Sequence, residues 1–140
     1  MALPFKKRVL IVEDDQEIRN SFSLIVNSSQ KFMVINAYSN CEDAIDNINR
    51  DKPEIILMDI ELPGMNGIQG TRIIKEKYPL IKVIALTMFN DERLVLDMME
   101  AGADGYILKS TTKEELSEAI QAVYNGGTYF CNSSSLRMKK

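Results

Sequence analysis

Acidic side chains follow two short apolar runs of this chain. Glu13 and Asp14 come directly after residues 9–12, and Asp59 closes a run that starts at residue 55. Runs of this length are typical of strands that are buried on both faces of a parallel sheet. If the two strands are neighbours, three carboxylates gather at one edge, and a bound cation would relieve their repulsion. Oxygen ligands suit Mg²⁺, and a carboxylate beside Mg²⁺ can act as a nucleophile toward phosphorus.

Two further polar side chains end apolar runs in the second half of the chain. Thr87 follows residues 83–86, and Lys109 follows residues 106–108. A threonine hydroxyl can donate a hydrogen bond to one phosphoryl oxygen, and a lysine ammonium can pair with another. Phosphoryl transfer requires mainly such positioning and neutralisation of charge. The acids, the hydroxyl and the ammonium are therefore sufficient to accept a phosphoryl group, provided that the fold brings them together.

The elements that would position these residues alternate regularly along the chain. Strands are predicted at 8–13, 32–37, 54–59, 81–86 and 104–108, and helices at 15–28, 40–50, 66–78, 91–101 and 113–125. This alternation predicts a single α/β domain with a parallel five-stranded sheet and helices on both faces. Right-handed crossovers favour the flavodoxin-like (βα)5 fold with strand order 2-1-3-4-5. In that order, the carboxyl ends of the first, third, fourth and fifth strands meet where open sheets bind ligands.

Capping residues support the last two predicted helices. Asn90 or Asp91 can cap the helix at 91–101, and Gly102 stands where its C-terminal cap is expected. Thr112 is followed three residues later by an acidic side chain, which is the pattern of a capping box. Both helices therefore have defined starts in the sequence.

The composition excludes several classes of protein. The 140 residues are enough for one full hydrophobic core, and the net charge of −3 argues against a basic face that grips nucleic acid. No apolar stretch approaches the roughly 18 residues that span a membrane. The chain has no His and only two widely spaced Cys, so a hard cation held by oxygens is the favoured metal. We expect a reduced, cytoplasmic protein without a signal peptide.

The combined pattern resembles the receiver (phosphoacceptor) domain of two-component response regulators. The resemblance rests on four residues: Asp14, Asp59, Thr87 and Lys109. It also rests on the segments around the two aspartates, residues 9–15 and 58–67. It covers roughly residues 7–130. Residues 1–6 are then an N-terminal extension, and residues 131–140 are a linker or a truncated tail.

The resemblance implies an acceptor and a metal site. Asp59 would be the phosphoacceptor, and a sensor histidine kinase would be the donor of the phosphoryl group. Glu13 and Asp14 would organise Mg²⁺ together with Asp59 and the backbone carbonyl of Glu61. From the residues alone, Glu13 and Asp15 could instead be solvated, and Asp15 could simply cap the first helix.

The resemblance also implies a switch. Thr87 and Lys109 would ligate the phosphoryl group, and Thr87 would move toward it on activation. Tyr106 stands at the aromatic switch position, whose ring turns inward when Thr87 moves. One departure is Ser110, which stands where many receivers have a proline after a cis peptide bond. The sequence leaves the isomer of the Lys109–Ser110 bond open.

The carboxyl-terminal part of the sequence narrows the resemblance to the NarL/FixJ (LuxR-type) subfamily. The segments that carry it are residues 86–89, 101–106 and 122–130. Members of this subfamily typically have a helix-turn-helix DNA-binding domain after the receiver. We therefore expect the regulatory part of a DNA-binding transcriptional regulator whose DNA-binding domain is absent from this chain. A stand-alone receiver that acts through protein–protein contacts is the alternative, and homodimer formation is left open.

Other functions use the same kind of sheet. A phosphatase with an aspartyl nucleophile would require a second aspartate where this chain has Glu61, and it would require a cap or substrate pocket. A flavodoxin-like electron carrier needs a phosphate-binding loop after the first strand, where residues 13–15 would repel phosphate. The intact residue set argues against a receiver-like scaffold that is never phosphorylated. We expect a phosphoacceptor domain that promotes its own phosphoryl transfer and dephosphorylation rather than an enzyme.

Overall fold

Strands and helices alternate through residues 5–130, which are the residues that the computed structural model describes. The strands are Lys7–Val12 (β1), Phe32–Tyr38 (β2), Ile55–Asp59 (β3), Lys82–Thr87 (β4), Gly105–Leu108 (β5) and Tyr129–Phe130 (β6). The helices are Gln16–Asn27 (α1), Cys41–Asp46 (α2), Ile48–Asp51 (α3), Gly67–Lys77 (α4), Glu92–Ala101 (α5) and Lys113–Tyr124 (α6). The predicted tail at 131–140, and most of the predicted extension at 1–6, lie outside the described residues.

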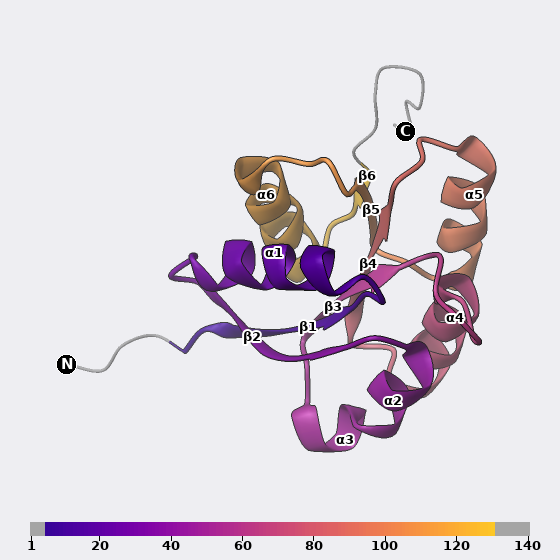
Figure 1. Ribbon diagram of the computed structural model, residues 1–140, viewed down its shortest axis with the longest axis horizontal. Helices are drawn as coiled ribbons and strands as arrows, with labels where there is room; N and C mark the ends of the chain where they lie inside the picture. Colours follow the sequence, from indigo (N-terminus) through magenta and orange to yellow (C-terminus); the bar gives the residue numbers. More distant parts are fainter. Residues whose placement is uncertain (1–4, 131–140) are drawn as a thin grey trace.

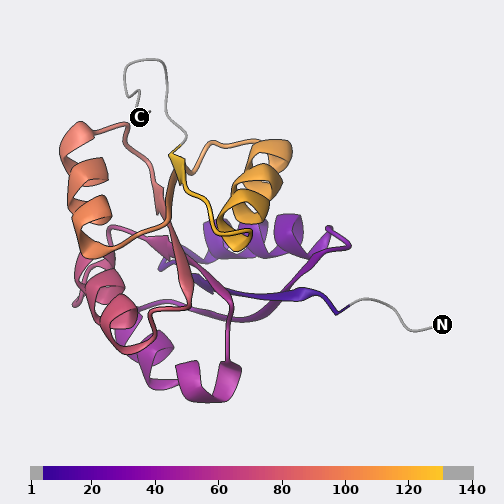
Figure 2. The same ribbon diagram turned by 180° about the vertical axis from the view of Figure 1, so that it is seen from behind.

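The strands of the described residues form one parallel sheet in the order β2-β1-β3-β4-β5-β6. The predicted flavodoxin-like order 2-1-3-4-5 is therefore confirmed. Helices α1 and α6 cover one face of the sheet, and α2, α3, α4 and α5 cover the other (Figures 1 and 2). None of the helices within residues 5–130 has the length and apolar character needed to cross a bilayer.

Each face of the sheet has its own apolar core. Val9 and Ile11 of β1 pack toward α1 and α6, whereas Leu10 and Val12 pack toward α2 and α4. Because successive side chains of a strand point to opposite faces, a strand covered on both faces must be apolar throughout. This is why residues 9–12 of β1 and residues 55–58 of β3 are unbroken apolar runs, each followed by an acidic residue.

The ends of the last two predicted helices follow their sequence signals. Asp91, rather than Asn90, caps α5, and its side chain accepts a hydrogen bond from the amide of Arg93 at 2.8 Å. Gly102 ends α5 with a φ of 103°, a conformation that favours glycine. Thr112 forms the expected capping box at the start of α6.

The structure corrects the predicted helix at 40–50, which is divided into α2 and α3. Asn47 lies between them with φ −106° and ψ 7°, and its side-chain amide donates to the carbonyl of Asp43 at 2.8 Å. An Asn side chain that bonds nearby backbone competes with the helical pattern, which explains the break. Lys52 then ends α3 in the left-handed region, at φ 50°.

Strand β6 was not predicted from the sequence. Tyr129 pairs with Gly105 and Phe130 pairs with Tyr106, in parallel, so that β6 extends the sheet beyond β5. Two residues after a Gly-Gly turn are too few to show a strand period. The strand can be recognised only from its pairing with β5 in the folded domain.

Candidate functional site

The carboxyl ends of β3, β4 and β5 lie side by side at one edge of the sheet. The strand register pairs Asp59 with Leu86, and Thr87 with Leu108. Asp59 and Thr87 are 2% and 1% exposed, so both polar side chains are buried. The fold thus brings together, from separate strands, residues that are far apart in the sequence.

Lys109 contacts two of the predicted acids. Its Nζ lies 2.7 Å from Glu13 Oε1 and 3.1 Å from Asp59 Oδ1. Burial alone would lower the pKa of Lys109, but the two carboxylates outweigh it and the pKa is raised. Lys109 is therefore a fixed positive charge at the site. Its peptide bond to Ser110 is trans.

Asp59 has one oxygen engaged and one free of protein partners. Oδ1 accepts a hydrogen bond from the amide of Glu61 at 3.2 Å and pairs with Lys109. Oδ2 is buried and has no hydrogen-bond partner among the described residues. Burial and the charge of Glu13 raise the pKa of Asp59 to about 7, against the opposing effect of Lys109. The negative charge of this carboxylate is thus only partly compensated by the protein.

Three carboxylates come close enough to share a cation. Oxygen atoms of Glu13, Asp14 and Asp59 lie within 4.8 Å of one another. Glu13 is fully buried, which rules out the alternative of a solvated side chain, while Asp14 is exposed. A hard cation such as Mg²⁺ takes one or two carboxylates and keeps water at its other positions, so this set of acids fits it. The role of the Glu61 carbonyl stays a prediction.

Asp15 belongs to the helix rather than to the cation site. Its side chain accepts from the amide of Ile18 at 3.0 Å, as the N-cap of α1. Its own amide donates to Glu13 Oε2 at 3.1 Å. The capping alternative for Asp15 is therefore the one that the structure shows.

Arg19 is a residue of the site that sequence reasoning missed. Its guanidinium donates to the backbone carbonyl of Glu13 at 2.7 Å and to that of Asp14 at 3.4 Å. Arg19 lies one helical turn after the cap Asp15, and its amide donates to the Asp15 carbonyl. A basic residue one turn after an acidic N-cap is a signal that could have suggested this contact.

The loop between β3 and α4 passes close to Asp59. A Cβ atom on Gly67 would lie 2.1 Å from the carbonyl oxygen of Asp59, so only glycine fits. The amide of Met65, in the same loop, donates to Glu42 Oε2 of α2 at 3.0 Å. The sequence did not predict this contact of Glu42, because Glu42 is distant from the loop in the sequence and no local pattern links them.

The two predicted switch residues are connected through Phe89. Thr87 Oγ1 accepts a hydrogen bond from the amide of Phe89 at 3.1 Å, and the Tyr106 hydroxyl donates to the Phe89 carbonyl at 2.9 Å. The Tyr106 ring points inward, 1% exposed, against a cluster that contains Ile60 and Met98. Burial raises the pKa of Tyr106, with the Thr87 hydroxyl opposing it.

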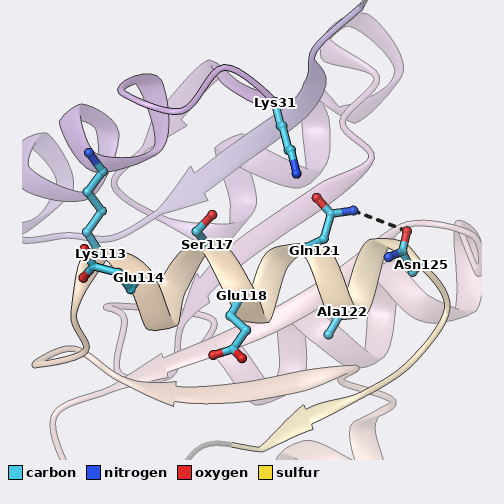
Figure 3. Close-up of a pocket in the computed structure, with 8 residues that line it drawn as sticks. All are labelled: Lys31, Lys113, Glu114, Ser117, Glu118, Gln121, Ala122 and Asn125. Atoms are coloured by element: carbon cyan, nitrogen blue, oxygen red, sulfur yellow. Dashed lines mark hydrogen bonds between the residues drawn. The ribbon is translucent and has the colours of Figure 1, made fainter.

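One cavity adjoins the site, and a separate groove follows helix α6. A cavity of about 430 Å³ is lined by Met88, Lys109 and Thr111, together with residues of α1. A larger, open groove of about 760 Å³ runs along α6 beside Lys31 (Figure 3). Its lining includes the pair Gln121 and Asn125, whose side chains are hydrogen-bonded at 3.3 Å. None of the predicted site residues lines this groove.

The comparisons with known proteins agree with this geometry. The family model described as the response regulator receiver domain matches residues 9–121. The chain belongs to the response regulator receiver family. It is 34% identical over 124 residues to the transcriptional regulatory protein DegU of Brevibacillus brevis, covering 89% of this chain and 52% of that protein. It is 33% identical to the oxygen regulatory protein NreC of Staphylococcus epidermidis, covering 87% of this chain and 56% of that protein.

Solved receiver structures have the same fold. A LuxR-family response regulator from Aurantimonas matches with a TM-score of 0.84 and 28% identity, covering 89% of each chain. A DNA-binding LuxR-family response regulator from Staphylococcus aureus matches with a TM-score of 0.80 and 30% identity, covering 85% of this chain and 99% of that one. The predicted LuxR-type subfamily is thereby confirmed. This receiver spans about half the length of the curated relatives it matches.

Proposed function

We propose that this receiver is a phosphorylation switch of a two-component system, with Asp59 as the acceptor of the phosphoryl group. The observation that supports the proposal best is the state of the Asp59 carboxylate. Its Oδ2 is buried without a hydrogen-bond partner among the described residues, while Lys109 lies 3.1 Å from Oδ1. A purely structural carboxylate would have both oxygens satisfied.

Asp59 and the residues around it have different roles in phosphoryl transfer. Asp59 Oδ2 donates an electron pair to phosphorus as the phosphorus–nitrogen bond of a phosphohistidine donor breaks, and the electron pair of that bond stays on the nitrogen of the departing imidazole. Lys109 and the Thr87 hydroxyl bind oxygens of the phosphoryl group. Burial of these side chains limits access of water and strengthens their electrostatic effect.

Mg²⁺ is the metal that we assign to the acidic cluster. Glu13, Asp14 and Asp59 would hold it, together with the backbone carbonyl of Glu61. When bound, Mg²⁺ neutralises the charge that accumulates between the acids and the phosphoryl oxygens. The protein's own part is to keep three carboxylates within 4.8 Å of one another before the cation arrives. That arrangement is unfavourable without a positive partner, which Lys109 supplies in part.

We infer that this receiver works in the cytoplasm and that its phosphoryl donor is a sensor histidine kinase. We also infer that the receiver regulates a helix-turn-helix DNA-binding domain beyond these 140 residues, with residues 131–140 as the linker. The support is that DegU is named a transcriptional regulatory protein and that the S. aureus structure is named a DNA-binding response regulator. Action through protein–protein contacts alone, including a homodimer, is the second candidate, since the net charge of −3 argues against DNA binding by the receiver itself.

Phosphorylation can be tested with a small phosphodonor. The protein is incubated with Mg²⁺ and acetyl phosphate, and its intact mass is measured for the wild type, for Asp59→Asn and for the control Asp46→Asn. Asp46 is an exposed residue at the end of α2, so its replacement leaves the site intact. We expect the wild type and the control to gain one phosphoryl group, and Asp59→Asn to gain none. A gain that persists in Asp59→Asn would exclude Asp59 as the acceptor.

A further inference from the structure

Strand β6 packs against two different apolar clusters at the edge of the sheet. The amide of Tyr129 donates to the carbonyl of Asp104 at 3.1 Å, beside β5. The side chain of Tyr129 packs against the core under α1 and α6, and that of Phe130 packs against the cluster that contains Tyr106. The last described residues thus reach the switch residue directly.

The close approach of β6 to β5 depends on a glycine. A Cβ atom on Gly105 would lie 3.0 Å from the carbonyl oxygen of Tyr129 and 3.2 Å from a side-chain carbon of Ile84. Since the residue before Tyr106 has no side chain, β6 can lie flat against the strand that holds the ring. The pairing involves only two residues on each strand, so we expect its local stability to be low.

A continuous series of contacts joins the acceptor edge to β6. Thr87 Oγ1 accepts from the Phe89 amide, and the Phe89 carbonyl accepts from the Tyr106 hydroxyl. The Tyr106 ring lies in the same apolar cluster as Ile60, the residue after the acceptor, and Phe130 packs against this cluster. A movement of Thr87 changes the first contact and therefore acts on each of the others.

We propose that Phe130 is a positioning residue for Tyr106, and that β6 conveys the state of the Thr87–Tyr106 pair to the carboxyl end of the domain. With the ring inward, Phe130 has an aromatic neighbour and β6 is paired with β5. With the ring outward, Phe130 loses that neighbour, and a two-residue pairing is too weak to persist alone. The proposal rests on the phosphorylation switch proposed above, because the phosphoryl group is what moves Thr87.

Amide hydrogen exchange detected by NMR can test this coupling. Exchange is measured on the protein with Mg²⁺, before and after addition of beryllofluoride as a phosphoryl mimic. The Tyr129 amide reports on β6, and the Glu61 amide, which donates to Asp59, reports on the acceptor. Coupling between sites typically corresponds to changes of about fivefold or more, so we expect beryllofluoride to slow Tyr129 exchange by at least about fivefold.

Variants separate a positioning role from a structural one. In Phe130→Ala, the response of Tyr129 should be lost, while acetyl phosphate still adds one phosphoryl group by intact mass. Phe130→Leu preserves an apolar contact and should retain part of the response. Phe5→Ala is the matched control, because Phe5 is 94% exposed at the other end of the domain. This control should respond like the wild type.

The outcomes distinguish the proposal from the proposed function. If beryllofluoride changes the exchange of Glu61 but not that of Tyr129 in the wild type, the switch stands and the role of β6 is refuted. If Phe130→Ala responds like the wild type, Phe130 does not position Tyr106. If neither amide responds in the wild type and acetyl phosphate adds no mass, the phosphorylation switch fails, and the role of β6 fails with it.

Discussion

Arg19 contacts neither acidic side chain of the cation site, yet it holds both of these residues by their backbone. Its guanidinium bonds the carbonyls of Glu13 and Asp14, so the loop after β1 is tied to the first turn of α1. A carboxylate that must meet a cation at a fixed place loses affinity when its backbone is free to move. Positioning at this site therefore depends on residues other than the ligands.

Replacing Arg19 should weaken binding of Mg²⁺. Arg19→Met keeps the apolar stem but removes all donors, and a hydrogen bond from a charged group typically contributes about 1.5–3 kcal/mol. Because Arg19 is partly exposed, we expect a smaller effect, a rise of about three- to tenfold in the Kd for Mg²⁺ measured by calorimetry.

Two further variants show whether the geometry or the charge of Arg19 supports the affinity for Mg²⁺. Arg19→Lys keeps the charge and should recover only part of the affinity, since an ammonium does not reproduce the guanidinium fork. Arg72→Met, at an exposed position of α4, removes the same charge elsewhere and should leave the Kd unchanged. An Arg19→Met protein with wild-type affinity would show that the loop is held in place without this side chain.

At the scale of elements, the start of α4 is fitted to the end of β3. Asn66 caps α4 through a capping box, and the amide of Gly67 donates to the carbonyl of Ile60 at 2.8 Å. The helix therefore begins within contact distance of the Asp59 backbone. A side chain at Gly67 would meet backbone atoms, which cannot rotate away as a flexible side chain can.

Gly67→Ala should lower both the stability of the protein and the phosphorylation of Asp59. Its Cβ would lie 2.1 Å from Asp59 O and 2.8 Å from Ile60 Cα, so either α4 or the end of β3 must shift. Overpacking commonly costs about 1–3 kcal/mol, and we expect the upper part of this range from urea unfolding. Gly127→Ala, whose Cβ would approach only the Ala122 carbonyl, is the control with a smaller loss. If Gly67→Ala is as stable as the wild type and is phosphorylated as well, a side chain at this position does not disturb the end of β3.

At the scale of the whole molecule, the reactivity of Cys41 measures how firmly helix α2 packs on the sheet. Cys41 is fully buried at the start of α2, and its sulfur lies 3.6 Å from Met58 Sδ and 3.6 Å from the carbonyl of Asn66. Burial, and then the charges of Glu42 and Asp59, raise the pKa of the thiol to about 12. The thiol is therefore protonated at neutral pH and shielded from reagents.

Cys41 should be unreactive until the domain opens. In a Cys131→Ser background, we expect iodoacetamide to modify native Cys41 at least about 10³-fold more slowly at pH 8 than the same protein unfolded in urea. The thiolate fraction alone predicts a difference of this order when a thiol of pKa near 8.5 is shifted to about 12. Rapid labelling of the native protein would mean that α2 separates from the sheet under native conditions. Mass spectrometry of quenched samples provides the rates.

Much of the fold was predictable because its signals are local. Apolar runs such as residues 55–58 must be covered on both faces, and caps such as Asp91 and Thr112 satisfy the free amides of the helix they begin. The break at Asn47 was missed because a side-chain hydrogen bond outweighed the helical pattern. Strand β6 was missed because two residues show no period.

The residue types that end each strand can be read from the sequence, and they predict that Asp59, Thr87 and Lys109 meet at one edge of a parallel sheet. The family can be read in the same way, since the joint spacing of these residues is specific. The folded domain adds three features that no local pattern shows: Asp59 Oδ2 has no partner among residues 5–130, Lys109 pairs with Glu13 as well, and Phe130 pairs with Tyr106. The physical reason is that strand order and alternation follow from local pattern, whereas side-chain contacts between distant segments depend on the register and spacing that the packed core sets.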